Sequence, residues 1–141
     1  MGDYEPPLED IKLVLKEISN IESLCQLPGY EHVDWDTING MLDELGRFVA
    51  EVIAPVNKVG DLEGCSVSDG VVTVPEAFGD AWDQFVAAGW GAVSQDPDYG
   101  GGGFPGAIQT VMTELLSTAS RSWSMGPMLT VGAVDCLCSF G

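Results

Sequence analysis

The residues best suited to do chemistry lie close together, in the glycine-rich stretch 96–106. Within it, Gly101, Gly103 and Gly106 have the spacing of a dinucleotide-binding fingerprint, in which backbone amides contact a pyrophosphate. That fingerprint needs a preceding strand and a following helix within a parallel βαβ unit, and this sequence carries no such pattern. The stretch is therefore more typical of a tight loop than of a phosphate-binding site.

Metal and nucleophile motifs are also incomplete. Asp96 and Asp98 begin like a calcium-binding loop, but the closing acid of such a loop would fall at Ala107, which cannot bind a metal ion. His32 is the one histidine, so the chain has no histidine pair for zinc, and no G-x-S-x-G nucleophile motif accompanies it. We expect His32 to be a solvated loop residue, and we expect no metal site.

The cysteines and carboxylates show no catalytic grouping. The four cysteines, at positions 25, 65, 136 and 138, are too few and too unevenly spaced for the disulfide framework of a small secreted protein. Cys136 and Cys138 stand one residue apart, so they point to different sides of a helix. Carboxylate pairs such as Asp43 and Glu44 fall on polar helix faces. We expect buried thiols and solvated acids, and identify no catalytic residue in the chain.

Acidic residues dominate the charge of the chain. It contains 22 acidic and 5 basic residues among 141, a formal net charge of −17. This charge repels nucleic-acid phosphates and anionic membrane surfaces, so we expect neither as a partner. The N-terminus carries acids where a secretory leader needs positive charge, and glycine and proline interrupt the apolar C-terminal segment. We expect a cytoplasmic protein with a core large enough to fold without disulfides.

Helical spacing of apolar residues runs through most of the chain. It predicts five helices: 7–24, from Asp34 or Asp36 to Pro55, from Pro75 to Gly89, from Pro105 to Ala119, and 127–140. Periodicity is lost between residues 57 and 75, where Asp69-Gly70 predicts a turn and residues 71–74 one short strand. We expect an all-α, orthogonal bundle of about five helices with one long irregular segment, in one domain spanning residues 1–141.

The predicted helices carry specific expectations. Pro55 has no amide donor, so the second helix is predicted to end or kink there. The third helix should end at Gly89 as a left-handed cap and bury Phe78, Trp82, Phe85 and Val86. The fourth should bury Ile108, Val111, Met112, Leu115, Leu116 and Ala119. The last is apolar on nearly all sides, which predicts that other elements surround it.

Several segments occur in a characteristic order. They are Ala54-Pro-Val-Asn-Lys-Val-Gly-Asp-Leu-Glu-Gly-Cys65, Gly89-Trp-Gly-Ala-Val93, Asp96-Pro-Asp-Tyr-Gly-Gly-Gly-Gly-Phe-Pro105, Glu114-Leu-Leu116 and Ser122-Trp-Ser-Met-Gly-Pro-Met-Leu-Thr-Val-Gly132. In this order they resemble the N-terminal helical domain of FAD-dependent acyl-CoA dehydrogenases, and the resemblance covers essentially the whole chain. The leading helix and residues 57–65 are most similar to the extended bacterial subgroup of methylthiopropanoyl-CoA dehydrogenases.

The resemblance implies an enzyme that binds FAD and oxidises an acyl-CoA thioester between its α and β carbons. It also implies partners: a β domain and a second helical domain, which supply most flavin contacts and the glutamate base, and further copies in a homo-oligomer. Two positions depart from the family, since Phe140 replaces a histidine common in the subgroup and Gly102 replaces a longer polar residue. The chain alone is expected neither to hold FAD nor to be active.

The resemblance also places a wall of the acyl pocket on two segments of this chain. Its residues are Tyr99, Gly100, Gly101 and Phe104 in the loop and Met125, Met128, Leu129 and Thr130 at the start of the last helix. Methionine suits such a wall, since its flexible thioether conforms to varied acyl chains. For Met128 and Leu129, ordinary core packing is an equally good interpretation. As a second hypothesis, the chain is a stand-alone helical interaction module without catalysis.

Overall fold

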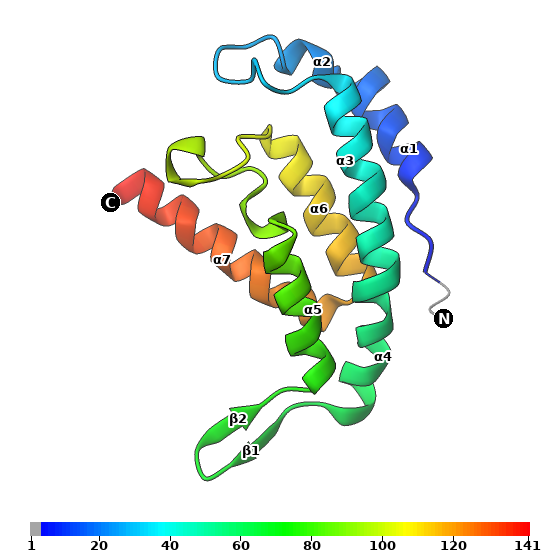
Figure 1. Ribbon diagram of the computed structural model, residues 1–141, viewed down its shortest axis with the longest axis vertical. Coiled ribbons are helices and arrows are strands. Elements are labelled where there is room, and N and C mark those ends of the chain that lie inside the picture. Colours follow the sequence, from blue (N-terminus) through cyan, green and yellow to red (C-terminus); the bar gives the residue numbers. More distant parts are fainter. Residues whose placement is uncertain (1–3) are drawn as a thin grey trace.

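The computed structural model describes residues 4–141, and most of them are helical (Figure 1). The α-helices are α1 Leu8–Leu13, α2 Ile21–Leu24, α3 Trp35–Phe48, α4 Ala54–Glu63, α5 Glu76–Ala87, α6 Gly106–Ala119 and α7 Arg121–Phe140. A two-stranded hairpin, β1 Ser66–Ser68 and β2 Val71–Thr73, connects α4 to α5. The all-α bundle predicted from the sequence is therefore confirmed.

The first predicted helix is divided into two parts. α1 continues through one π-helical turn, Val14–Ile18, and stops at Ser19. Asn20 takes a left-handed conformation, with a φ of 49°, before α2 begins. A left-handed residue breaks a right-handed helix, and asparagine tolerates that conformation better than most residues. The prediction of one helix over 7–24 is wrong at this break.

A long helical rod runs down Figure 1 beside α1 and consists of α3, a π-helical turn at Val49–Ile53, and α4. It begins where the side chain of Asp34 accepts a hydrogen bond of 2.8 Å from the amide of Thr37. This contact satisfies one of the amides that the first turn of a helix leaves without a partner. Of the two predicted starting residues, Asp34 and Asp36, the structure uses Asp34 as the cap.

The rod does not end at Pro55, where the sequence predicted an end or a kink, but continues to Glu63. In the π-helical turn the amide of Ala54 donates to the carbonyl of Val49, five residues back. The wider turn comes just before the proline ring, so the ring meets a backbone that is already displaced from regular α-helical geometry. This local widening lets the helix pass a residue that usually terminates it.

One core runs along the bundle and is built mainly from the rod and α6. The rod contributes five side chains that are 0% exposed: Ile38, Leu42, Leu45, Val49 and Ile53. The six α6 side chains predicted to be buried are all buried: Ile108, Val111, Met112, Leu115, Leu116 and Ala119. The fourth predicted helix is therefore confirmed in both its position and its buried face.

α5 follows its prediction only in part. Phe85 is buried and packs edge-on against Trp123, with ring centroids 5.4 Å apart. Trp82 and Val86, however, are 38% and 59% exposed. Trp82 borders the packed face, with its ring centroid 6.2 Å from that of Trp123, and Val86 is more exposed, so the predicted stripe is too wide. Gly89, with a φ of 76°, follows the helix as the predicted left-handed cap.

α7 begins earlier than predicted, at Arg121, and contains Pro127 within it. Its first turns reach the core through Trp123, but none of the described residues 128–141 is buried. Leu137 and Phe140 are 69% and 87% exposed, so the prediction that other elements surround this helix is wrong within the chain. Figure 1 shows the reason, because the second half of α7 leaves the bundle. No helix of residues 4–141, α7 included, is both long and apolar enough to cross a membrane.

The prediction that the cysteine thiols are buried is wrong. Cys65, Cys136 and Cys138 are exposed, and Cys25 is partly buried. Cys136 and Cys138 lie on the second half of α7, residues 128–140, which we call the open half of α7. Their exposure has the same cause as that of the apolar side chains of this segment. Burial, followed by nearby acids such as Asp34, raises the pKa of the Cys25 thiol and disfavours the reactive thiolate.

The segment after α4 forms a hairpin where the sequence predicted one strand. Val67 faces Val72 in its antiparallel register. Asp69 and Gly70 have φ values of 50° and 79°, as in the two-residue turns that favour Asp-Gly. The predicted turn is confirmed, whereas the first strand was missed because it is short and contains two serines. All strand residues are exposed, and the hairpin projects beyond the ends of α4 and α5 (Figure 1).

Candidate functional site

The irregular segment between α5 and α6 is an ordered loop. It contains two 3-10 turns, Trp90–Ala92 and Pro97–Tyr99. Four consecutive amides then donate to backbone carbonyls of the first half: Gly101 to Asp96 at 3.0 Å, Gly102 to Ala92 at 2.8 Å, Gly103 to Gln95 at 3.0 Å and Phe104 to Val93 at 3.0 Å. These bonds fix the path of residues 99–104, which we call the glycine loop.

Close backbone approach explains the run of glycines. A Cβ added at Gly101 would lie 2.1 Å from the carbonyl oxygen of Gln95. At Gly102 it would lie 2.6 Å from the carbonyl oxygen of Val93. Neither contact can be relieved by moving a flexible side chain, because the obstructing atoms belong to the backbone. The two positions therefore require glycine for the loop to close on itself.

The glycine loop is not a phosphate-binding site. The amides of residues 101–104, which a pyrophosphate would need, already donate within the loop. The carboxylate of Asp96 accepts the amide of Asp98 at 2.8 Å and so closes its own turn. Among residues 4–141, no group of three or more His, Cys, Asp or Glu side chains is placed to hold a metal ion. These residues do not fit the pyrophosphate of FAD, and we assign no flavin contact to the loop.

His32 is exposed and lies in the loop before α3, as expected, but its ring is not free. Its Nε2 lies 2.9 Å from the carbonyl oxygen of Gly102, which is 70 residues further along the chain. The carbonyl can only accept, so Nε2 donates this hydrogen bond. The prediction of a solvated loop histidine is confirmed, and the hydrogen bond to Gly102 is an additional contact that the sequence did not predict. Nothing in the spacing of the sequence connects the two positions.

A groove of about 300 Å³ lies between residues 95–99, where the glycine loop begins, and the second half of α7. Its walls are Gln95, Asp96 and Tyr99 on one side and Val134, Leu137 and Cys138 on the other. The sequence analysis selected Tyr99 but missed the three α7 residues. These residues stand at positions i, i+3 and i+4, so the sequence could have shown that they share one face of the helix. The spacing could not show that this face meets the loop.

The other predicted wall residues fall into separate places. Met128 lines a small cavity with core residues, among them Phe85 and Met112. Met125 borders a shallow surface hollow beside Lys58. The remaining residues are distributed as follows: Gly100, Gly101 and Phe104 in the glycine loop, and Leu129 and Thr130 exposed on α7. Within this chain, the eight residues therefore do not form one surface: four lie in the glycine loop, and those of α7 are divided between a core cavity, a surface hollow and solvent.

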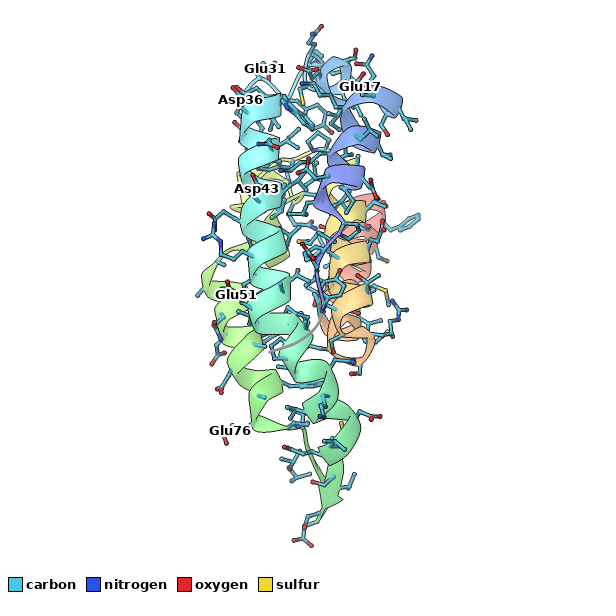
Figure 2. The ribbon with its side chains drawn as sticks, turned by 90° about the vertical axis from the view of Figure 1, so that its right-hand side faces the viewer. Glu17, Glu31, Asp36, Asp43, Glu51 and Glu76 are labelled. Atoms are coloured by element: carbon cyan, nitrogen blue, oxygen red, sulfur yellow. The ribbon has the colours of Figure 1, made fainter. Side chains whose placement is uncertain are left out.

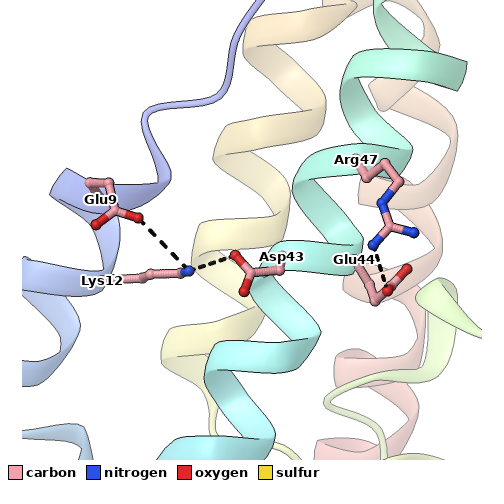
Figure 3. Close-up of polar contacts among 5 residues, drawn as sticks. All are labelled: Glu9, Lys12, Asp43, Glu44 and Arg47. Atoms are coloured by element: carbon pink, nitrogen blue, oxygen red, sulfur yellow. Dashed lines mark hydrogen bonds and ion pairs between the residues drawn. The ribbon is translucent and has the colours of Figure 1, made fainter.

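Acidic side chains are spread over the outside of the bundle, and Figure 2 shows Asp43 and Glu51 along the rod. Lys12 of α1 contacts Asp43 of α3 at 2.5 Å, and Arg47 pairs with Glu44 at 2.7 Å (Figure 3). The 5 basic residues of the chain cannot pair its 22 acids. The groove shares this character, because its one charged wall residue is Asp96. An uncharged or apolar ligand therefore suits it better than an anion.

Comparison with known proteins gives one informative match. No protein-family model matches the chain. A 3-methylmercaptopropionyl-CoA dehydrogenase from Ruegeria pomeroyi is 36% identical over 134 residues, or 95% of this chain. The chain spans only 23% of the length of that protein. The resemblance inferred from the ordered segments is thereby confirmed: over nearly its whole length, this chain is similar to part of an acyl-CoA dehydrogenase.

Proposed function

We propose that the chain is the N-terminal helical domain of a longer, cytoplasmic, FAD-dependent acyl-CoA dehydrogenase. The observation that carries the proposal is the 36% identity, which extends over 95% of this chain but 23% of the relative. In the proposed reaction, a carboxylate base outside this chain would take the α proton of the acyl-CoA, and FAD held by the other domains would supply the hydride acceptor for the β carbon. The product then has a double bond between these two carbons.

The task of this chain is to bind and enclose the acyl group. The proposed wall comprises Tyr99, Gly100, Gly101 and Phe104 on the loop and Met125, Met128, Leu129 and Thr130 on α7. Met125 and Leu129 are 38% and 66% exposed, so a substrate or a neighbouring domain can reach them. Apolar walls exclude water from the reacting carbons, and methionine conforms to acyl groups of different shape.

The open half of α7 supports the presence of further polypeptide. Leu137 and Phe140 are 69% and 87% exposed on the same helix. Apolar side chains gathered on an exposed face usually mark a surface that contacts another protein or domain. In the proposed enzyme, the β domain and the second helical domain cover this face and supply the flavin contacts, and the enzyme forms a homo-oligomer.

The size and colour of the native protein test this proposal. An antibody raised against the chain should detect a native protein several times larger than 14.9 kDa. The purified protein should be yellow, should lose this colour with an acyl-CoA such as 3-methylmercaptopropionyl-CoA, and should reduce an electron-accepting dye. The 141-residue chain is the control and should be colourless and inactive. A colourless native protein that reduces no dye would overturn the proposal.

Two exposed leucines test the proposed wall in the same protein. Leu129 is 66% exposed on α7, and Leu27 is 51% exposed near α2. Leu129→Ala removes three carbons from an apolar binding surface and should raise the KM for acyl-CoA by about tenfold or more, since one methylene alone changes binding by about tenfold or more. Leu27→Ala should leave KM unchanged. Equal changes of KM in the two variants would show that Leu129 does not contact the acyl group.

The exposed surfaces also favour a second candidate, a stand-alone interaction module without catalysis. Both the open half of α7 and the valines of the hairpin present apolar side chains to solvent. This candidate predicts a native band at 14.9 kDa and light scattering that shows a complex or a self-associated species. A band several times larger contradicts it.

A further inference from the structure

His32 links two parts of the chain that the sequence does not connect. The turn that carries it is anchored in the core, since Val33 is 4% exposed and its amide donates to the carbonyl of Tyr30 at 2.9 Å. From this anchored turn, Nε2 donates to the carbonyl oxygen of Gly102 at 2.9 Å. This hydrogen bond ties the glycine loop to the turn before α3, whereas the other hydrogen bonds of residues 101–104 stay within residues 92–104.

The ring also packs against the loop. Gly103 has a φ of +61°, and a Cβ added there would lie 2.8 Å from Cγ of Pro97 and 3.1 Å from Cε1 of His32. The imidazole therefore limits the space at Gly103 while it binds the carbonyl of the preceding residue. The internal hydrogen bonds of the loop use amides, whereas this bond uses the Gly102 carbonyl. It adds a restraint that the loop cannot supply for itself.

The bond requires a hydrogen on Nε2. Nε2 carries a hydrogen in the protonated imidazole and also in the neutral tautomer that donates from this atom. A glutamine side chain ends in an amide nitrogen at similar reach and can make the same donation. Leucine has a comparable volume but no donor. The structure therefore offers one substitution that keeps the bond and one that removes it.

We propose that His32 is a positioning residue. Its hydrogen bond to Gly102 holds the glycine loop in the shape in which it contributes to the acyl wall, and thereby sets which acyl groups are accepted. The second part rests on the proposed function, whereas the first part concerns only the loop. The two parts are tested by different measurements on the same native protein.

Hydrogen exchange tests the positioning of the loop. His32→Leu should speed exchange of the amides of residues 101–104 by about two- to tenfold, as expected for loss of one hydrogen bond. His32→Gln should restore near-native exchange. Amides in the middle of α6 serve as the internal control and should not change. Unchanged loop exchange in His32→Leu, or failure of His32→Gln to restore it, would overturn the assignment.

Steady-state kinetics test the effect on selectivity. With a series of acyl-CoA thioesters of increasing chain length, His32→Leu should shift the ratio of kcat/KM between short and long acyl groups by about two- to tenfold, mainly through KM. His32→Gln should keep the native ratio. An equal change for every thioester would overturn the selectivity role. A native protein with no activity would overturn the proposed function, and the exchange measurement would still decide whether His32 positions the loop.

Discussion

α6 and α7 follow each other in the chain and are both rich in apolar residues, yet the bundle treats them differently. In α6, Leu115 and Met112 are each 1% exposed. In α7, none of the described residues 128–141 is buried, and Leu137 is 69% exposed. The difference lies in the surroundings, because α6 packs against the rod while the second half of α7 leaves the bundle (Figure 1). Apolar spacing shows which face avoids water, and the rest of the fold decides whether this chain covers that face.

The largest expected effect comes from one leucine in each helix. Leu115→Ala leaves a cavity in the core and should lower the free energy of unfolding by about 2–5 kcal/mol. Leu137→Ala removes a side chain that is 69% exposed and should change it by less than about 0.5 kcal/mol. Urea unfolding of the 141-residue chain measures both. Similar losses for the two variants would mean that α7 is packed in solution.

The glycine loop, whose first residue Tyr99 borders the groove opposite α7, offers a second pair of substitutions. Gly101→Ala would place a Cβ 2.1 Å from a backbone oxygen and should cost about 1–3 kcal/mol as the loop shifts. At Gly40, inside α3, a Cβ would meet no atom of the described chain within 4 Å. Gly40→Ala should therefore stabilise the chain by up to about 1 kcal/mol. Thermal melts of both variants provide the measurement, and a neutral Gly101→Ala would contradict the tight loop.

The sequence was most informative where local rules and global packing agree. The six buried positions of α6, a cap at Asp34 or Asp36 and the left-handed Gly89 were all predicted correctly. The exposure of Trp82 was not, because a helix stripe predicts burial without knowing the width of the partner surface. The passage through Pro55 was missed for a different reason. It depends on a π-helical turn, which has no clear sequence signal.

The candidate site was less predictable than the fold. Its glycine loop was recognised from composition and from the family resemblance, but the α7 side of the groove and the bond from His32 to Gly102 were not. Both features bring together residues that are far apart in the chain. A single sequence reports local periodicity well, whereas pairings across 70 residues appear only when the chain is folded.

The rod and α7 also differ in charge, and this difference gives a smaller effect. The rod carries many acids, such as Asp43 and Glu51 (Figure 2), whereas α7 carries only Asp135 as an acid. With a net charge of −17, the acids repel one another, and the screening length falls from about 10 Å at 0.1 M salt to about 3 Å at 1 M. Sodium chloride should therefore raise the Tm by about 2–5 °C over this range. Glu51→Gln should reduce the salt dependence, and a flat or falling trend would contradict the role of charge.

The cap of α3 lies on the well-packed part of the bundle, and its pH dependence gives the smallest expected effect on stability. Hydrogen bonds from Thr37 to the side chain of Asp34 hold the pKa of this carboxyl below its usual range. Because the folded pKa is lower than the unfolded one, the stabilisation is complete above the unfolded pKa and is lost as the pH falls through the folded pKa. The stability difference between the native chain and Asp34→Ala should therefore be full near neutral pH and shrink in acid.

Asp34→Asn caps without a charge, so its advantage over Asp34→Ala should not depend on pH. Unfolding midpoints of the three proteins across the acid range decide the matter. A difference between the native chain and Asp34→Ala that stays constant into strong acid would mean that the ionised carboxylate is not what begins the rod.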